Sequence, residues 1–492
     1  MTTLCIDAGT TVIKAVLFDR GGAAIGSARR ETATLRPNWA WSEQSMPAVW
    51  DAVVDLVREL KAAAGAPIEA LSITGQGDGA WLIDAEGEPT GPAILWNDGR
   101  AGAIVETWHK NGLIAEDFRV CGSRSFAGAP HAILAWLAQH DPERLRRSAS
   151  LLSCTGWINF KLTGNRRIDA SDAALPFLDL ASGAARADVW ERFGIGAAER
   201  LLPELVADEA RAAPIDPRVA EQLGLAADVQ IVLAPYDIGC MALGVGATDP
   251  GQACAILGTT ICVQSVLGAP DLSGSPTGIN IPLFDRFLRA FPTLAGCEVL
   301  DRMIALTGAG SVEDFEGLAR QAAPGADGLL LLPYLSPAGE RAPFYSVEAC
   351  GVLHGLRTTH GRSEIARATF EALAFTVADC LAFAAQMPDA IMLCGGGARS
   401  DLWCQLIADT TGCTVRRSTE QEVGARGALV AAHAVLRGVN IGLAFAQMDV
   451  ATEHFAPDNA GRAQGQARIE RARRLRTLAA HDWTLSGDAA HG

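Results

Sequence analysis

Two short turns that carry hydroxyl groups stand at the tips of predicted apolar hairpins, almost half a chain apart. They are Gly9-Thr10-Thr11 and Gly258-Thr259-Thr260. A turn of this kind presents backbone N–H groups and hydroxyl donors, which a polyphosphate requires. Only the first copy has an aspartate before it (Asp7) and a lysine after it (Lys14). The pair therefore predicts two duplicated lobes that close on one nucleotide, alike in fold and unequal in chemistry.

Asp7 is the candidate metal ligand of the first turn. A carboxylate beside a phosphate-binding turn suits Mg²⁺, which keeps much of its hydration shell and binds through water. The structural alternative is a turn aspartate that caps its own backbone.

A second candidate for nucleotide contact is Gly395-Gly396-Gly397, at a predicted junction of a strand and a helix. Three glycines let a flat ligand approach the backbone closely, and the start of a helix favours anionic groups. The chain has neither Gly-x-Gly-x-x-Gly nor Gly-x-x-x-x-Gly-Lys-[Ser/Thr]. Neither a dinucleotide-binding fold nor a P-loop is therefore supported.

The acceptor side of the chemistry is predicted from polar residues that follow three strands. Asp237 ends a buried strand and is followed by small residues, so it is well placed to accept a hydroxyl proton. A polar collar comes from the segments 75–79 and 96–100, in which carboxylates and amides can bind vicinal hydroxyls and Trp96 offers an apolar face. No basic cluster occurs in the collar, and a neutral acceptor is therefore expected.

Composition limits the class of protein. The chain has 492 residues, is half apolar and carries a formal net charge of −15, so several soluble domains are expected and a nucleic acid or an anionic membrane is not an expected partner. No run approaches the ~18 uninterrupted apolar residues that would span a bilayer. The twelve cysteines form no Cys-x-x-Cys pair and no cluster with histidine, which predicts a reducing cytoplasm without a zinc site.

The order of elements predicts an α/β layer fold in two halves. A hairpin, a third strand, a helix over 46–64 and a buried strand over 68–74 open the chain, and the second hairpin restarts the pattern near residue 247. We expect an N-terminal acceptor-binding lobe over 1–246 and a C-terminal ATP-binding lobe over 247–492. A basic amphipathic helix over 466–480 is predicted to be a solvated surface helix.

Taken together, these segments resemble the FGGY carbohydrate kinases of the actin-like ATPase superfamily over nearly the whole chain. The most specific likeness runs from Gly351 to Leu356 and from Glu364 to Glu371, and the segments 333–335 and 340–343 are also similar to the family. The resemblance implies two actin-like (ribonuclease H-like) α/β lobes with a catalytic cleft between them. It also implies a cytoplasmic enzyme that uses ATP and Mg²⁺ to phosphorylate a primary hydroxyl.

The same resemblance assigns roles to individual residues. Asp7 would organise Mg²⁺, and Asp237 would be the base that deprotonates the acceptor for in-line attack on the γ-phosphate. The residues expected at ATP are Thr10, Thr11, Lys14, Gly258, Thr259, Thr260, Gly396, Gly397, Ala398 and Asp401. Those expected at the acceptor are Gln76, Gly77, Asp78, Trp96, Asn97, Asp98 and Asp237.

The identity of the acceptor is the most specific inference from the sequence. The Arg-Glu pair of glycerol kinases and the Met-His pair of D-xylulose kinases are both absent after the strand that ends near Gly75. The segments 75–82 and 96–101 look most like erythritol kinases and next most like L-xylulose kinases. A small neutral polyol or sugar is therefore the expected partner, and a homodimer stays open. The alternatives of another class are a non-catalytic sugar sensor and an actin-like ATPase.

Overall fold

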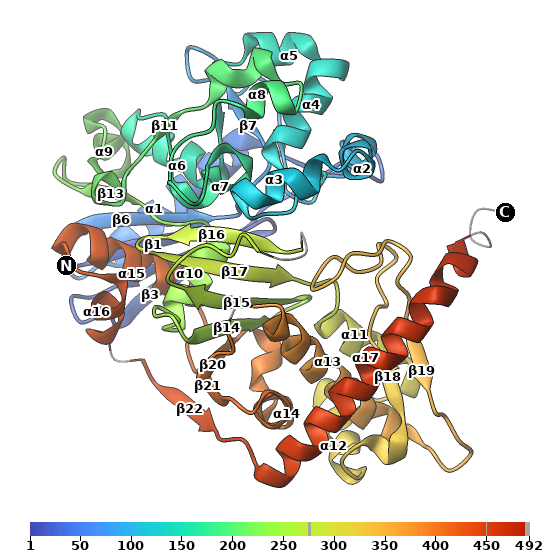
Figure 1. Cartoon of the computed structure of the whole chain (residues 1–492). Helices are drawn as coiled ribbons and strands as arrows, with labels where there is room; N and C mark the ends of the chain where they lie inside the picture. Colours follow the sequence, from blue (N-terminus) through green and yellow to red (C-terminus); the bar gives the residue numbers. More distant parts are fainter. Residues whose placement is uncertain (274–276, 385, 449, 488–492) are drawn as a thin grey trace.

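The computed structural model describes residues 1–273, 277–384, 386–448 and 450–487, and it contains two large mixed sheets that lie next to each other (Figure 1). Each sheet has helices on both faces. The sheets differ in size, with six strands in the first and seven in the second.

The first sheet has the strand order β12-β13-β6-β1-β2-β3. Strands β1 to β3 are antiparallel, whereas β6 and β13 run parallel to β1. The central strands are buried on both faces, as expected for parallel strands between helices. Their bounds are β1 Thr3–Ala8, β2 Val12–Phe18, β3 Ala24–Glu31, β6 Ala70–Gly75, β12 Ala212–Pro214 and β13 Gln230–Leu233.

The second sheet repeats this plan in the order β16-β17-β15-β14-β20-β21-β22. Here β14, β15 and β17 are antiparallel, and β20 and β21 run parallel to β14. The bounds are β14 Gln252–Leu257, β15 Ile261–Leu267, β16 Ile279–Leu283, β17 Arg286–Pro292, β20 Ala390–Cys394, β21 Thr414–Ser418 and β22 Thr452–Phe455.

The two hydroxyl-bearing turns occupy equivalent places, between the first two strands of each sheet. In the first sheet Ala8 pairs with Ile13, so the connection holds four residues, whereas in the second Leu257 pairs with Ile261 and the connection holds three. The predicted duplication is therefore present in the topology, and the two turns differ by one residue in length.

The remaining elements cover and connect the sheets. The helices are α1 Met46–Ala63, α2 Gly102–Lys110, α3 Leu113–Cys121, α4 Pro130–His140, α5 Pro142–Arg147, α6 Cys154–Thr163, α7 Ala170–Phe177, α8 Val189–Arg192, α9 Pro217–Leu223, α10 Asp237–Gly244, α11 Cys297–Thr307, α12 Val312–Gln321, α13 Arg362–Ala382, α14 Asp401–Thr411, α15 Val423–Arg437, α16 Ile441–Ala446 and α17 Asn459–Gly487. Short strands are β4 Thr34–Leu35, β5 Glu43–Gln44, β7 Trp81–Ile83, β8 Ala93–Ile94, β9 Ser150–Leu152, β10 Arg167–Ile168, β11 Glu204–Leu205, β18 Leu330–Leu332 and β19 Val352–His354. Within this described part, no helix is both long and apolar enough to cross a membrane.

Helices α10 and α15 fill the space between the two sheets, and they pack with their backbones almost in contact. A Cβ at Gly427 of α15 would overlap the carbonyl oxygen of Cys240 in α10, and a Cβ at Gly244 of α10 would overlap that of Val423 in α15. Helix α15 comes from the second half of the chain but lies on the first sheet, where Ser72 of β6 donates a hydrogen bond to the carbonyl of Ala428 at 2.7 Å. This pair of helices therefore fixes the distance between the sheets.

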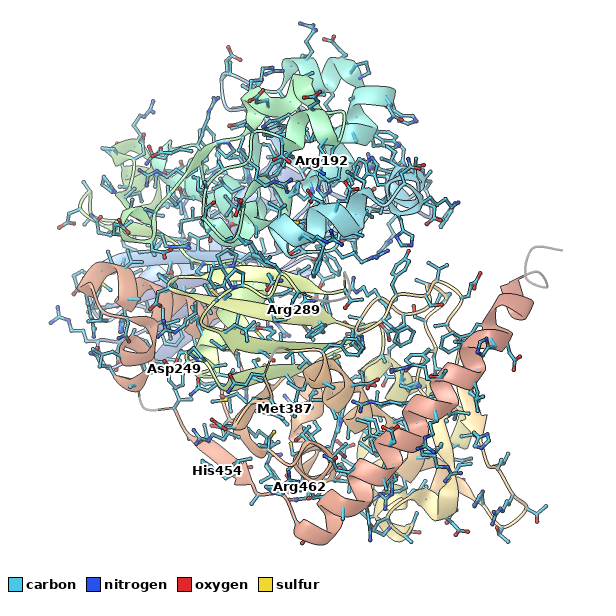
Figure 2. The ribbon with its side chains drawn as sticks, in the orientation of Figure 1. Arg192, Asp249, Arg289, Met387, His454 and Arg462 are labelled. Carbon is cyan, nitrogen blue, oxygen red and sulfur yellow. The ribbon has the colours of Figure 1, made fainter. Side chains whose placement is uncertain are left out.

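The first lobe also carries a helical insertion, α2 to α8, that rests on the edge strand β16 of the second sheet (Figure 1). Asn280 of β16 donates to the carbonyl of Gly122, and Arg124 donates its backbone N–H to the carbonyl of Gly278 at 3.0 Å. Arg289 of β17 is labelled in Figure 2, and its guanidinium carbon lies 5.2 Å from the centre of the ring of Phe118 in α3. The loop after α3 is thus pinned to the second sheet.

The last helix, α17, runs diagonally across the outside of the second lobe (Figure 1). Arg473 and Arg476 both bind the buried carboxylate of Asp379 in α13, and Arg468 binds the buried carboxylate of Glu371. The prediction of a plain solvated helix over 466–480 is therefore wrong for this face, because its arginines neutralise carboxylates that burial would otherwise penalise.

We expect Gly427→Ala to lower the free energy of unfolding by about 2 kcal/mol or more, because the new methyl group would overlap a helix backbone that cannot move away. Thermal melting measures the change. The matched control is Gly317→Ala in α12, where, apart from the backbone of its own helix, no atom of the described residues lies within 4 Å of the added Cβ, so that this variant gains about 0.5–1 kcal/mol from helix propensity. Equal melting temperatures for the two variants would contradict the close packing described above.

Candidate functional site

Three carboxylates lie where neighbouring parallel strands end. Asp7 is near the end of β1, Asp78 follows β6, and Asp237 follows β13 as the first residue of α10. These three strands are adjacent and parallel, so their carboxyl ends meet at one edge of the first sheet, facing the second lobe. The sheet topology thus gathers residues that are far apart in the sequence.

A cavity of about 360 Å³ opens at this edge, between the two lobes. The first lobe contributes the segments after β6, β8 and β13 together with α2 and the loop after α3, and the second lobe contributes residues of β15 to β17 and of the loop that follows β18. The lining residues are Gly77, Asp78, Trp96, Gly102, Val105, Glu106, Arg124, Ser125, Phe126, Ala127, Tyr236, Asp237, Ile238, Thr260, Cys262, Gly278, Ile279, Pro292, Arg341, Ala342 and Tyr345.

Burial raises the pKa values of all three carboxyl groups. Desolvation raises the pKa of Asp237 to about 7, an effect that the charge of Asp7 increases and a hydrogen bond from the Ile238 N–H (2.7 Å) partly offsets. Desolvation likewise raises the pKa of Asp78 to about 7, against the opposing effect of Arg341, and that of Asp7 to about 6. A carboxyl group that titrates near neutral pH is suited to accept a proton from a substrate.

Asp7 sits in a cradle that only glycine permits. A Cβ at Gly424, at the start of α15, would overlap the carboxylate of Asp7. Lys14, expected at ATP, instead forms an ion pair with Glu422 at 2.9 Å, which ties the first hairpin to the residue before α15. Within the described ranges, no group of three or more His, Cys, Asp or Glu residues is arranged to hold a metal by itself. A metal at Asp7 would thus draw its other ligands from water or substrate.

The first turn is held by side chains of the collar. Thr10 donates its hydroxyl proton to Oε1 of Gln76 at 3.0 Å and accepts a hydrogen bond from Trp96 Nε1 at 3.0 Å. Gln76 also donates to Gln44, whose amide reaches the carbonyl of Thr10. Gln76, expected at the acceptor, is thus buried beneath the turn and does not line the cavity, whereas Thr11 remains exposed.

The collar segment 96–100 also contains both residues that line the cavity and residues that do not. Trp96 lines the cavity, but Asn97 is exposed outside it, and Asp98 is buried in an ion pair with Arg100 at 2.8 Å. Asp98 also accepts a hydrogen bond from the Ser42 N–H at 2.6 Å. Its carboxylate therefore supports the chain locally, while Gly77, Asp78, Trp96 and Asp237 are the acceptor candidates that the cavity brings together.

The second turn adjoins the glycine-rich segment, as nucleotide contact requires. Thr259 is exposed and Thr260 lines the cavity, while the carbonyl of Gly258 accepts a hydrogen bond from the Cys297 N–H at the start of α11. Gly395 (φ +90°) lies against the backbone of Leu257, the residue before this turn.

The glycine-rich segment itself is open on one side. A Cβ added at Gly396 would point into open space, with no atom of the described residues within 4 Å, whereas Gly397 packs on the ring of Trp403. Ala398 is buried, and Asp401 forms an ion pair with Arg417 at 2.8 Å. Arg417 also binds the carbonyl of Ala398, so Asp401 holds the shape of the segment through that arginine.

Several cavity residues were not predicted from the sequence. Arg341, Tyr345, Arg124 and Phe126 come from two loops that carry no chemical motif of their own, and Tyr236 precedes the predicted base. Arg341 lies inside a segment that already resembled the family, which is the only signal that pointed to it. The collar was expected to hold no basic cluster, and the two arginines that line the cavity, Arg124 and Arg341, come from other segments of the chain.

Comparison with known proteins adds a family assignment. The model for the N-terminal domain of the FGGY family of carbohydrate kinases matches residues 2–244, and the model for its C-terminal domain matches residues 298–435. The chain is 30% identical over 487 residues to a xylulose kinase of Escherichia coli, covering 96% of this chain and 97% of that protein. It is 29% identical over 476 residues to an erythritol kinase of Brucella abortus, covering 92% and 90% of the two chains.

A solved structure confirms the two-lobe α/β fold. A ligand-bound xylulose kinase from Lactobacillus acidophilus superposes with a TM-score of 0.92, at 24% identity, over 98% of this chain and 99% of that one. At that identity the likeness bears on the fold alone.

We expect the buried carboxyl of Asp237 to destabilise the folded protein above neutral pH. Its pKa is raised to about 7 from the ordinary value of 3.8, so the folded state holds the proton longer than the unfolded state and stability falls as pH rises between these values. Asp237→Asn removes this penalty. The melting temperature of the variant should match that of the wild type near pH 4 and exceed it by about 2 °C or more above pH 7. The exposed control Asp228→Asn should show no such divergence, and a pH-independent difference for Asp237→Asn would contradict the raised pKa.

Proposed function

This chain belongs to the FGGY family of carbohydrate kinases, and we propose that it transfers the γ-phosphoryl group of ATP to a primary hydroxyl of a small polyol or ketose. Its membership makes it an ATP-dependent sugar or polyol kinase. The observation that carries the finer proposal is the position of Asp237, which lines the cavity between the lobes together with acceptor candidates of the first lobe and Thr260 of the second turn.

Asp237 is the general base of this proposal. It is fixed at the N-terminus of α10, where the Ile238 N–H holds one carboxylate oxygen and leaves the other for a substrate hydroxyl. A pKa of about 7 lets the group be ionised before the reaction and take up a proton during it. Positioning and charge neutralisation supply most of the remaining rate in phosphoryl transfer.

The proposed path of ATP follows the second lobe. The adenosine would lie along Gly396, Gly397 and Ala398, where the backbone is open at Gly396, and the phosphates would pass the turn 258–260 toward Asp237. Support comes from the contact of Gly395 with Leu257, which makes the two segments one continuous surface. Thr10 and Thr11 would meet the terminal phosphate from the first lobe. Lys14 and Asp401 would support the ATP site indirectly, because the side chain of each is engaged in an ion pair with another residue of the chain.

Mg²⁺ is proposed at Asp7. The absence of a side chain at Gly424 lets the carboxylate of Asp7 lie against the start of α15, and a carboxylate outside any larger group of protein ligands suits an ion that keeps its water and binds phosphate oxygens. When bound, the ion would neutralise phosphate charge. The residues of the chain would orient the hydroxyl and remove its proton.

For the acceptor, we propose Gly77, Asp78 and Trp96 as the binding surface, with erythritol first and L-xylulose second on the sequence resemblance. A location in the cytoplasm agrees with twelve unpaired cysteine thiols in the described part of the chain. A non-catalytic sensor or a bare actin-like ATPase is the alternative, and the presence of both Asp7 and Asp237 argues against it.

The test is ADP release from Mg-ATP with a panel of acceptors: erythritol, D-threitol, ribitol, glycerol, D- and L-xylulose, D- and L-ribulose and L-erythrulose. One acceptor should stimulate the wild type strongly, and Asp237→Asn should lower kcat by about 10²–10⁴-fold with ATP binding nearly intact, because only the base is lost. The exposed control Asp228→Asn should behave as the wild type. Full activity of Asp237→Asn would refute the assignment of the base, and hydrolysis indifferent to every acceptor would favour the bare ATPase.

Asp78→Asn should raise KM for the acceptor about tenfold or more and leave KM for ATP within about twofold, because the variant loses a charged hydrogen-bond acceptor at one end of the cavity. Asparagine is chosen because Asp78 has a φ of +55°, a left-handed conformation that asparagine tolerates better than alanine. Steady-state kinetics with each substrate varied in turn measures both constants. Equal weakening of acceptor and ATP would remove Asp78 from the acceptor surface.

A further inference from the structure

Arg341 is a cation that the second lobe delivers to the acceptor end of the cavity. It lies in the loop after β18, and its Nε donates a hydrogen bond to the carbonyl of Pro292 at 2.8 Å. Its guanidinium carbon is 5.9 Å from the ring centre of Trp96, a residue of the opposite lobe. Its charge also lowers the pKa of Asp78, a first-lobe residue proposed to bind the acceptor, and both residues line the same cavity.

The two terminal amino groups of Arg341 have no hydrogen-bond or ion-pair partner in the part of the chain that the structure describes. The neighbouring carboxylate of Glu340, likewise described, forms no ion pair with the Arg341 side chain, and one of its oxygens accepts hydrogen bonds from the backbone N–H groups of Leu294 (2.7 Å) and Arg341 (2.9 Å). Arg341 and Asp78, both described, are not joined by an ion pair. A guanidinium with one fixed donor and its other donors directed into a cavity is arranged to bind a ligand oxygen.

The loop holds this arginine rigidly. Tyr334 and Phe344, on either side of it, pack against each other and against Trp483 of α17, with ring centres 5.1 to 6.1 Å apart. A side chain whose backbone is fixed in this way loses little entropy on binding.

We propose that Arg341 binds a carbonyl or carboxylate oxygen of the acceptor, so that the kinase acts on ketoses or sugar acids in preference to alditols. The planar fork of a guanidinium matches an sp² oxygen or a carboxylate, whereas a hydroxyl oxygen has no such match and carries less negative charge. Asp78, on the first lobe, takes hydroxyl groups of the same acceptor. The bound acceptor thus joins the two lobes. This inference rests on the proposed function, and it places a ketose above erythritol among the candidates.

The experiment compares Arg341→Gln and Arg341→Lys with the wild type on three acceptors: L-xylulose, D-gluconate and erythritol. We expect the wild type to prefer L-xylulose or D-gluconate by tenfold or more in kcat/KM. Arg341→Gln should raise KM for that acceptor by about 10–100-fold, with kcat and KM for ATP within about threefold. Arg341→Lys, which keeps the charge and loses the fork, should recover more of the affinity for a ketone than for a carboxylate. This difference tells the two oxygen sources apart.

The controls separate folding from recognition. Arg302→Gln, an exposed arginine of α11, should leave all constants unchanged, and each variant is checked by thermal melting and by ATP binding. Preference of the wild type for erythritol would overturn the inference. So would a fall in kcat that is equal for every acceptor, which would place Arg341 at the transferred phosphoryl group. Failure of every acceptor of the panel, these three included, to stimulate ADP release by the wild type would instead refute the kinase proposal on which the inference depends.

Discussion

The backbone contact between α10 and α15 is the constraint on which the rest of this structure depends. Glycines at 244 and 427 remove the side chains that would hold the helices apart, and the two sheets approach as closely as this pair allows. The proposed base stands at the start of α10 and Asp7 lies against the start of α15, so both are positioned by the two helices that this contact joins. A change in helix spacing would therefore shift the proposed base relative to the predicted metal ligand.

The same contact explains why three carboxylates are shielded from water. Asp7, Asp78 and Asp237 all have raised pKa values because the lobes exclude water around them, and their mutual repulsion adds to the effect on Asp237. Such an arrangement lowers stability in the absence of ligand and becomes favourable when hydroxyl donors or cations fill the cavity. The residues that lower the stability of the folded protein are therefore the same residues that carry the proposed chemistry.

Local patterns predicted the parts of the molecule that local sequence determines. The hairpin turns, the strand before Asp237 and the helix from Met46 are set by apolar periodicity and turn residues, and they appear where expected. Gln76 and Asp98 were expected at the acceptor because polar residues after a strand often face a site. Their partners, Gln44 and Ser42, lie more than thirty residues away, and a single sequence does not reveal such pairs. For the same reason, the sequence did not reveal that Arg341 lines the cavity or that arginines of α17 bind buried carboxylates.

Helix α17 connects a residue late in the sequence to the wall of the cavity. Trp483 packs against the loop that carries Arg341 and Tyr345. The wall of the cavity contributed by the second lobe is therefore supported by one of the last described residues. During synthesis, the first sheet and its carboxylates emerge long before this support exists. Asp7, Asp78 and Asp237 are therefore synthesised well before the aromatic contact that supports the second-lobe wall of the cavity can form.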